Sequence, residues 1–127
     1  EAVLIYLDAD AVETVLRRLS ARFPGALLLT DTTSSKMVDA QGKHDAMSKL
    51  SRESWFRWRC DDPRLVERWG PTLERSLTLA DVPPDVLPHL PVLYRGLLRL
   101  APWLLRRQVD GYRINRFRLG VGATAAA

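Results

Sequence analysis

The sequence predicts an α/β fold in which a mostly parallel sheet carries an antiparallel strand at its edge. An amphipathic helical pattern over residues 10–23 is followed by a short apolar run, 26–30, which together make half of a β-α-β unit. That run shows no alternation, which is typical of a strand buried on both faces of a parallel sheet. Two later strand patterns, near 73–82 and 112–119, are expected to be neighbours at one edge, where mixed sheets often hold an antiparallel strand.

The composition is that of one ordinary globular domain: 127 residues, of which 46% are hydrophobic and 27% charged. Cys60 is the single cysteine, so no internal disulfide forms, and no metal-ligand spacing surrounds it. We therefore expect no metal and a reducing, cytoplasmic compartment. No apolar run approaches the roughly 18 residues that cross a bilayer, so we expect no transmembrane segment. The chain opens inside an apolar run, 2–7, and we expect this run to continue from a missing N-terminal half or a partner chain.

The first helix and strand have clear boundaries. Asp10 with Glu13 three residues later forms a capping-box-like start, and apolar residues recur at helical spacing from 12 to 23. Pro24-Gly25 ends the helix, and the apolar strand that follows ends just before Asp31. The sequence thus predicts a helix and a buried strand in direct succession.

The middle of the chain is more polar. Residues from about 32 to 54 read as a helical insert, interrupted by Gly42. From Trp55 to Cys60 aromatic or apolar residues alternate with arginine, which indicates a short extended segment with one apolar face. Asp61-Asp62-Pro63 then begins a helix that ends at Gly70-Pro71.

The last third holds a strand, a helix and a final strand. Pro83-Pro84 closes the strand pattern of 73–82, and a helix is expected from about Val92 to Val109, with a kink or split at Pro102. The turn Asp110-Gly111 leads into the last strand. Residues 120–127 are small and are expected to form an unanchored tail.

Several segments together resemble a known family. The opening, Glu-Ala-Val-Leu-Ile-Tyr-Leu over residues 1–7, is similar to the Glu-Gly-Val-Leu-Met-Tyr-Leu segment of leucine-carboxyl-methyltransferase-like enzymes, which include O-methyltransferases of polyketide biosynthesis. The resemblance covers about residues 1–120. It continues in Leu19–Gly25, Thr30-Asp31-Thr32, Phe56-Arg57-Trp58, Asp61-Asp62-Pro63 and Leu90–Tyr94.

The resemblance implies the C-terminal part of a class I, Rossmann-like methyltransferase fold, with residues 1–119 as the C-terminal half of the domain. It implies S-adenosylmethionine as cofactor and O-methyl transfer to a small-molecule, polyketide-like or carboxylate acceptor; carboxylate, phenol and alcohol acceptors all remain open. The family's glycine-rich cofactor loop and ribose-binding acid precede this sequence, and Gly120-Val121-Gly122 opens no helix. We therefore expect the chain alone to bind S-adenosylmethionine weakly or not at all, and to be inactive.

Ligands of open α/β sheets bind at the carboxyl ends of strands, so two acids expected there, Glu1 and Asp31, are candidate ligand contacts. The resemblance implies that Glu1 and Ala2, the latter in place of the family's glycine, face the methionine part of the cofactor, where a carboxylate suits the ammonium group. Asp31 is expected near the substrate mouth; alternatively it caps the next helix, and Glu1 is only a ragged end. Arg57 and Trp58 either line a pocket for an aromatic or acidic substrate or form a core face with the arginine turned outward.

A catalytic base is not identifiable, because His44 and His89 have no carboxylate at an obvious spacing. The net charge of +4 suggests a second class of function, since residues 95–118 hold seven arginines against the acid Asp110. The alternative is a non-enzymatic binding module that uses this Arg95–Arg118 surface for an anionic partner or a membrane surface. No RNA-binding motif is present, so a nucleic acid is not favoured.

Overall fold

The computed structural model describes residues 2–43, 49, 51–78, 80–100, 103 and 109–120. Short 3-10 helices are labelled η. The elements in chain order are η1 (Leu4–Tyr6), α1 (Ala9–Arg22), β1 (Leu27–Thr33), α2 (Ser35–Ala40), η2 (Gln41–Lys43), η3 (Arg52–Ser54), η4 (Pro63–Trp69), β2 (Thr72–Thr78), η5 (Leu87–His89), α4 (Val92–Leu100) and β3 (Tyr112–Arg118).

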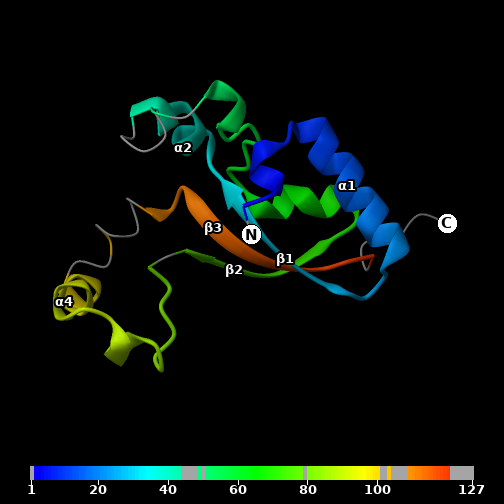
Figure 1. Cartoon of the computed structure of the whole chain (residues 1–127). Helices are drawn as coiled ribbons and strands as arrows, with labels where there is room; N and C mark the ends of the chain where they lie inside the picture. Colours follow the sequence, from blue (N-terminus) through cyan, green and yellow to red (C-terminus); the bar gives the residue numbers. More distant parts are fainter. Residues whose placement is uncertain are drawn as a thin grey trace.

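The described strands form one three-stranded sheet in the order β1-β3-β2, and both pairings are antiparallel (Figure 1). The prediction of a mostly parallel, Rossmann-like methyltransferase sheet is therefore wrong. The last strand of the sequence lies in the centre of the sheet, so each ladder joins an earlier strand to β3. A helix followed by an apolar strand predicts a β-α-β unit, but this pattern carries no information about which strands pair. The two late strands are neighbours, as expected, but β3 lies in the centre of the sheet and not at its edge.

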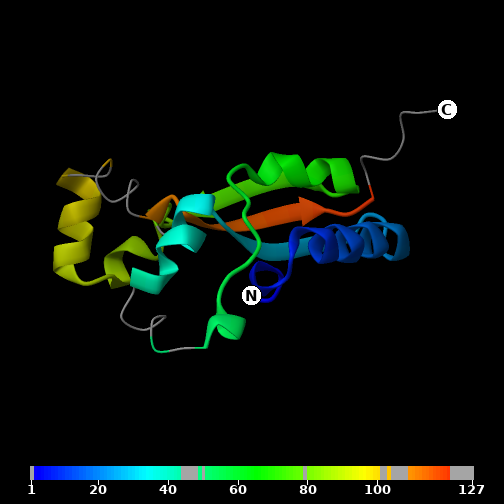
Figure 2. The ribbon, with the colours of Figure 1, turned by 90° about the horizontal axis from the view of Figure 1, so that it is seen from above.

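The core lies on one face of this sheet. Leu28, Phe117 and Leu73 stand opposite one another in the register and pack beneath η1, α1 and η4. Figures 1 and 2 show these helices on the same side of the sheet, with α1 and η4 lying side by side. The buried residues of this core are Leu4, Val12, Leu16, Trp58, Cys60, Val66, Trp69 and Phe117.

The opposite face of the sheet exposes apolar side chains. Leu27 and Leu29 of β1 are 55% and 67% exposed, and Ile114 of β3 is 45% exposed. The prediction that residues 26–30 are buried on both faces is therefore wrong. The cause is that η1, α1 and η4 all pack on the other face, so only every second side chain of β1 reaches the core.

Helix α1 begins and ends close to the predicted boundaries. Val12 and Leu16 are fully buried, as the helical spacing predicts. The N-cap is Asp8, whose backbone is extended and whose side chain makes no capping hydrogen bond, so the predicted capping box at Asp10 is wrong. The chain leaves the helix through Gly25, whose φ of +81° is a conformation that glycine adopts without a steric penalty.

The segment 55–60 alternates as predicted but is not a strand. Trp58 and Cys60 are buried, whereas Arg57 and Arg59 are exposed. The backbone N–H groups of Arg57 and Trp58 donate to the carbonyl of Ile5 rather than to a neighbouring strand. The alternation therefore reports burial on one side and not pairing in a sheet.

The next helix, η4, starts where the sequence predicts it. Pro63 occupies its first turn, and the Asp62 carboxylate accepts a hydrogen bond from the backbone N–H of Arg64 at 2.9 Å. The helix ends at Gly70, whose φ is +111°. Its buried side chains, Val66 and Trp69, close the core above β2.

Helix α4 lies beyond one end of the sheet, apart from α1 and η4 in both views (Figures 1 and 2). None of its nine residues is buried. The predicted kink at Pro102 and the rest of that predicted helix up to 108, apart from Trp103, lie outside the described residues, as do 44–48, Leu50 and 121–127. No helix in the described ranges is long and apolar enough to span a membrane.

Candidate functional site

Asp31, near the carboxyl end of β1, is the most buried acid of the described chain, at 2% exposed. One oxygen of its carboxylate, Oδ2, has two donors. The backbone N–H of Ala2 donates to it over 2.7 Å, and the hydroxyl of Tyr112 donates to it as well. Two charge-assisted hydrogen bonds therefore fix the orientation of this carboxylate.

The second oxygen of the same carboxylate, Oδ1, is buried without a hydrogen-bond partner. Asp31 lines a pocket of about 330 Å³ together with Leu29, Thr30 and Ile114. A buried carboxylate oxygen that accepts no hydrogen bond lowers stability, because its solvation by water has been lost and not replaced. The pocket is thus lined by two aliphatic side chains and by an acid that has one unpartnered carboxylate oxygen.

The register of the sheet explains why these side chains meet. Asp31 pairs with Ile114 across the β1–β3 ladder, and Thr33 pairs with Tyr112. Side chains alternate between faces, so Leu29, Asp31, Ile114 and Tyr112 belong to the face turned away from the core. Tyr112 is the diagonal neighbour of Asp31 on that face, within reach of a long side chain.

Ala2 lies two residues before η1, which packs against β1. Its φ of +53° is in the left-handed region, where a side chain is disfavoured and glycine is not. The glycine of the family segment that this opening resembles stands at the same place. The structure therefore brings together two of the site residues named from the sequence, Ala2 and Asp31, while Glu1 lies outside the described residues.

Arg57 and Trp58 do not line the Asp31 pocket. Arg57 is exposed, forms a long ion pair with Asp8 (3.7 Å), and lines a separate pocket of about 470 Å³ with Trp55 and other residues. Trp58 is buried in the core, where its ring centroid lies 6.5 Å from that of Trp69. Of the two alternatives given for this segment, Trp58 therefore fits the core face and not the substrate pocket, and the arginines on either side of it are turned outward.

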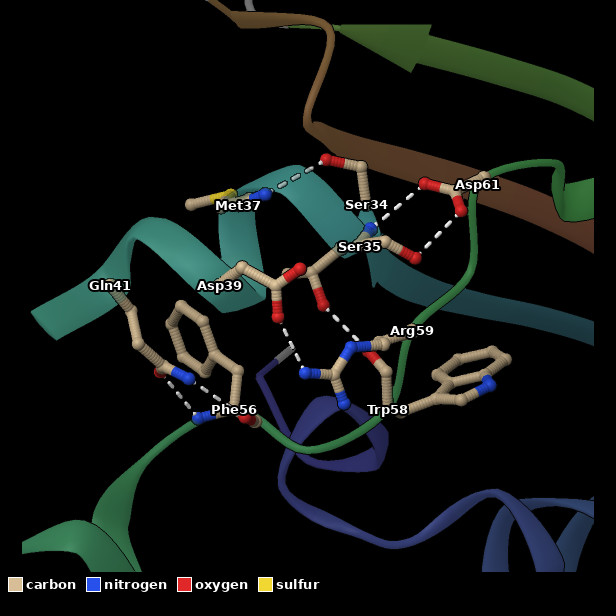
Figure 3. A network of polar contacts seen from close by, with 10 residues as sticks. Ser34, Ser35, Met37, Asp39, Gln41, Phe56, Trp58, Arg59 and Asp61 are labelled. Atoms are coloured by element: carbon tan, nitrogen blue, oxygen red, sulfur yellow. Dashed lines mark hydrogen bonds and ion pairs between the residues drawn. The ribbon is translucent and has the colours of Figure 1, made fainter.

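Arg59 and Asp61 join the same segment to helix α2 (Figure 3). Arg59 pairs with Asp39 at 2.6 Å, and Asp61 accepts from the hydroxyl and the backbone N–H of Ser35 at 2.7 and 2.8 Å. These two hydrogen bonds, the hydroxyl's first, lower the pKa of Asp61 from its ordinary 3.8. Each charge here already has a partner within the chain, which indicates a structural clamp.

Two further contacts hold the backbone of this segment (Figure 3). The side-chain amide of Gln41 donates to the carbonyl of Phe56 at 2.9 Å and accepts from its N–H at 2.8 Å. The Thr33 hydroxyl donates to the carbonyl of Trp58 at 2.9 Å. The segment is therefore fixed by Gln41 and by Thr33, the last residue of β1.

The described arginines of 95–118 do not form one surface. Arg116 and Arg118 both pair with Glu74 on β2, at 3.0 and 2.6 Å, and Arg113 pairs with Asp110 at 3.7 Å. Arg106 and Arg107 lie outside the described residues. The positive charge that stands away from the sheet is therefore that of α4.

The remaining titratable candidates do not form a reactive centre. His89 is exposed on η5, and His44 lies outside the described residues. Burial, with nearby Asp62 and Asp61, raises the pKa of the Cys60 thiol from 9.0 to about 12, so the thiol stays protonated and unreactive. Within the described ranges no three histidine, cysteine or acidic side chains converge as metal ligands.

Comparisons of the chain with protein-family models, with curated proteins and with solved structures found no match. The site is therefore interpreted from its own chemistry. Sequence reasoning missed Tyr112 and Ile114 at this site. Their strand was predicted, but a strand pattern does not identify its neighbour, and only the β1–β3 register places them beside Asp31.

The described residues do not make a complete site for S-adenosylmethionine. The free oxygen of Asp31 suits an ammonium group, but the same surface holds no second acid for the ribose. The chain also lacks a glycine-rich loop at a helix start, the feature that binds such nucleosides in open α/β folds. No step of methyl transfer follows from these residues alone.

Proposed function

We propose that this chain is the acceptor-binding part of an S-adenosylmethionine-dependent O-methyltransferase. One observation carries the proposal. Two segments of the family resemblance, residues 1–7 and 30–32, meet in a hydrogen bond between Ala2 and the buried Asp31, and Asp31 also lines a pocket. The antiparallel sheet contributes nothing to the proposal, which rests on that contact and on the sequence.

The role of the chain's own residues is to position the acceptor. S-adenosylmethionine, when bound, supplies an activated methyl group. The aliphatic side chains of Leu29 and Ile114 would bind the body of the acceptor, and Asp31 would orient its polar group. Holding the reacting oxygen in place is the larger part of catalysis for such a transfer.

The test is calorimetric titration of S-adenosylmethionine and S-adenosylhomocysteine into the 127-residue chain and into the full product of its gene. We expect binding by the full product and little or none by the chain alone, because the cofactor loop is not in this sequence. Binding by the full product should be followed by methyl transfer from labelled cofactor to a panel of phenols, alcohols and carboxylates. Absence of cofactor binding in both samples would overturn the proposal.

A second function, attachment to an anionic membrane surface, is favoured by helix α4. Val92, Leu93 and Leu100 are 74%, 86% and 87% exposed, and at 100° per residue they lie within one third of the helix circumference. Arg95 and Arg99 stand beside this apolar face, and α4 holds no acidic residue. An exposed apolar face bordered by arginine is typical of helices that lie in the interface of anionic membranes.

Sedimentation with vesicles separates this second function from the first. We expect the chain to bind vesicles that contain phosphatidylglycerol and not vesicles of phosphatidylcholine alone, and to lose binding in Leu93→Glu/Leu100→Glu. The control is Leu65→Glu, an exposed apolar residue of η4, which should bind like wild type. Equal binding to both kinds of vesicle, or loss in the control, would contradict it.

A further inference from the structure

Asp31 is an acid whose burial lacks a structural explanation. Oδ2 is bonded to Ala2 and Tyr112 and so contributes to the fold. Oδ1 accepts no hydrogen bond from any described residue, although the residue is 98% shielded from solvent. Buried polar atoms without partners are rare in folded proteins. Because Asp31 also lines a pocket, we take Oδ1 as the acceptor for a ligand bound there.

The surroundings of Oδ1 narrow the chemistry of that ligand. The pocket of about 330 Å³ is lined by Leu29, Thr30 and Ile114 besides Asp31 itself. Leu29 and Ile114 present aliphatic surface, since both are exposed on the face away from the core. A ligand therefore needs an apolar body with one N–H or O–H donor at its end.

The negative charge of Asp31 excludes ligands that would place a carboxylate at Oδ1. A carboxylate placed at Oδ1 would bring two negative charges together in a partly desolvated site, and no cation lines this pocket. Arg113 is paired with Asp110, and Arg116 is paired with Glu74. The pocket thus discriminates between donors and anions by electrostatics as well as by hydrogen bonding.

We propose that the Asp31 pocket binds small apolar molecules through a hydroxyl or ammonium donor and rejects carboxylates. Identifying this ligand with the methyl acceptor rests on the proposed function, and in that case the acceptor is a phenol or alcohol and not a carboxylic acid. If the donor is an ammonium group, the pocket serves amine recognition and its ligand is not the methyl acceptor. In both cases the ligand donates a hydrogen bond to Oδ1 of Asp31.

Three ring compounds of similar size test the pocket: phenol, benzylammonium and benzoate, titrated into the 127-residue chain and followed by NMR. We expect phenol and benzylammonium to shift the methyl signals of Leu29 and Ile114, and benzoate to leave them unchanged. Asp31→Asn should weaken benzylammonium binding by about tenfold or more, because the ammonium group then meets a neutral amide oxygen in place of a charged carboxylate. Asp10→Asn, an exposed carboxylate on α1, is the matched control and should bind like wild type.

A second variant keeps the test decisive if Asp31→Asn does not fold. Ile114→Trp fills the pocket from an exposed position and leaves Asp31 intact, so it should abolish binding of both donors without loss of the fold. Benzoate binding equal to phenol, or donor binding unaffected by Ile114→Trp, would overturn the inference. The proposed function fails separately, if the full gene product binds no S-adenosylmethionine. Methyl transfer to carboxylates only would leave that function standing and overturn the identification of the pocket's ligand with the methyl acceptor.

Discussion

Two regions of the molecule differ sharply in how they use apolar residues. The body, defined as residues 2–33, 58–78 and 112–120, holds a cluster of buried apolar side chains between one sheet face and three helices. The α4 segment, residues 80–100, is also rich in leucine and valine, yet none of its residues is buried. Both regions have clear amphipathic patterns.

The difference teaches that an amphipathic pattern predicts an apolar face but not a partner for it. Helix α1 buries Val12 and Leu16 because β1 and η4 supply a facing surface. Helix α4 has a comparable apolar face, and the described chain supplies no surface to cover it. The two regions should therefore respond oppositely to the same kinds of substitution.

The largest effect is expected at the centre of the body. Phe117→Ala removes a fully buried ring from the middle strand and leaves a cavity, so the free energy of unfolding should fall by about 3–5 kcal/mol. Leu93→Ala in the α4 segment, at an 86% exposed position, should change it by less than about 0.5 kcal/mol. Urea unfolding followed by circular dichroism measures both. A comparable loss at Leu93 would show that α4 is packed against the body.

Two glycines extend the comparison to the backbone. Gly120 has a φ of +69°, and a Cβ there would lie 2.9 Å from the carbonyl oxygen of Ser20. Gly120→Ala should therefore lower the free energy of unfolding by about 2–3 kcal/mol. At Gly96 in α4 a Cβ would meet nothing within 4 Å, and Gly96→Ala should favour the helix by up to about 1 kcal/mol.

These two variants are each other's control, because the chemical change is identical. Thermal unfolding should place Gly120→Ala below wild type in Tm, while the helical signal at 222 nm should rise slightly for Gly96→Ala. A drop in Tm for Gly96→Ala similar to that of Gly120→Ala would mean that the α4 helix has close neighbours.

The sequence predicted the local elements of the body well and their assembly poorly. Helix α1, the strand after Gly25 and the last strand all appear near their predicted bounds, because spacing, proline and glycine are local signals. The parallel sheet was wrong because strand pairing is set by long-range contacts, such as Leu28 with Phe117. The apolar run 26–30 looked buried on both faces, but composition does not report how many layers cover a strand.

The candidate site was predictable only in part. Asp31 was found because acids at the carboxyl ends of strands are common ligand contacts, and Ala2 because of the family resemblance. The hydrogen bond between Ala2 and Asp31 joins residues 29 positions apart in the sequence, and the one from Tyr112 joins residues 81 positions apart. Neither contact can be predicted from a local sequence pattern. Trp58 and Arg57 were candidates because aromatic and basic residues alternate there, and the structure places one in the core and the other in an ion pair.

A smaller effect is expected at Ala2, where the body is strained. Its left-handed backbone disfavours a Cβ by roughly 1–2 kcal/mol, so Ala2→Gly relieves strain, although glycine also gains entropy in the unfolded chain. We expect a net gain of about 0.5–1 kcal/mol in the free energy of unfolding and an intact Asp31 pocket. Urea unfolding, with Ala9→Gly at the start of α1 as the control, measures it. A loss of stability at Ala2→Gly would mean that the methyl group packs favourably.

The smallest effect is a pH dependence at Asp61, whose carboxylate ties the body to α2 through Ser35. Those hydrogen bonds hold its pKa below 3.8 in the folded chain, so their contribution is present above that pH and is lost as the pH falls through the lower, folded value. Asp61→Ala should lower Tm at pH 6, and the difference from wild type should narrow below about pH 4. Asp85→Ala, an exposed acid in the α4 segment, should track wild type throughout the scan. A difference for Asp61→Ala that stays constant from pH 6 to pH 3 would show that packing of the side chain, and not its charge, holds α2 to the body.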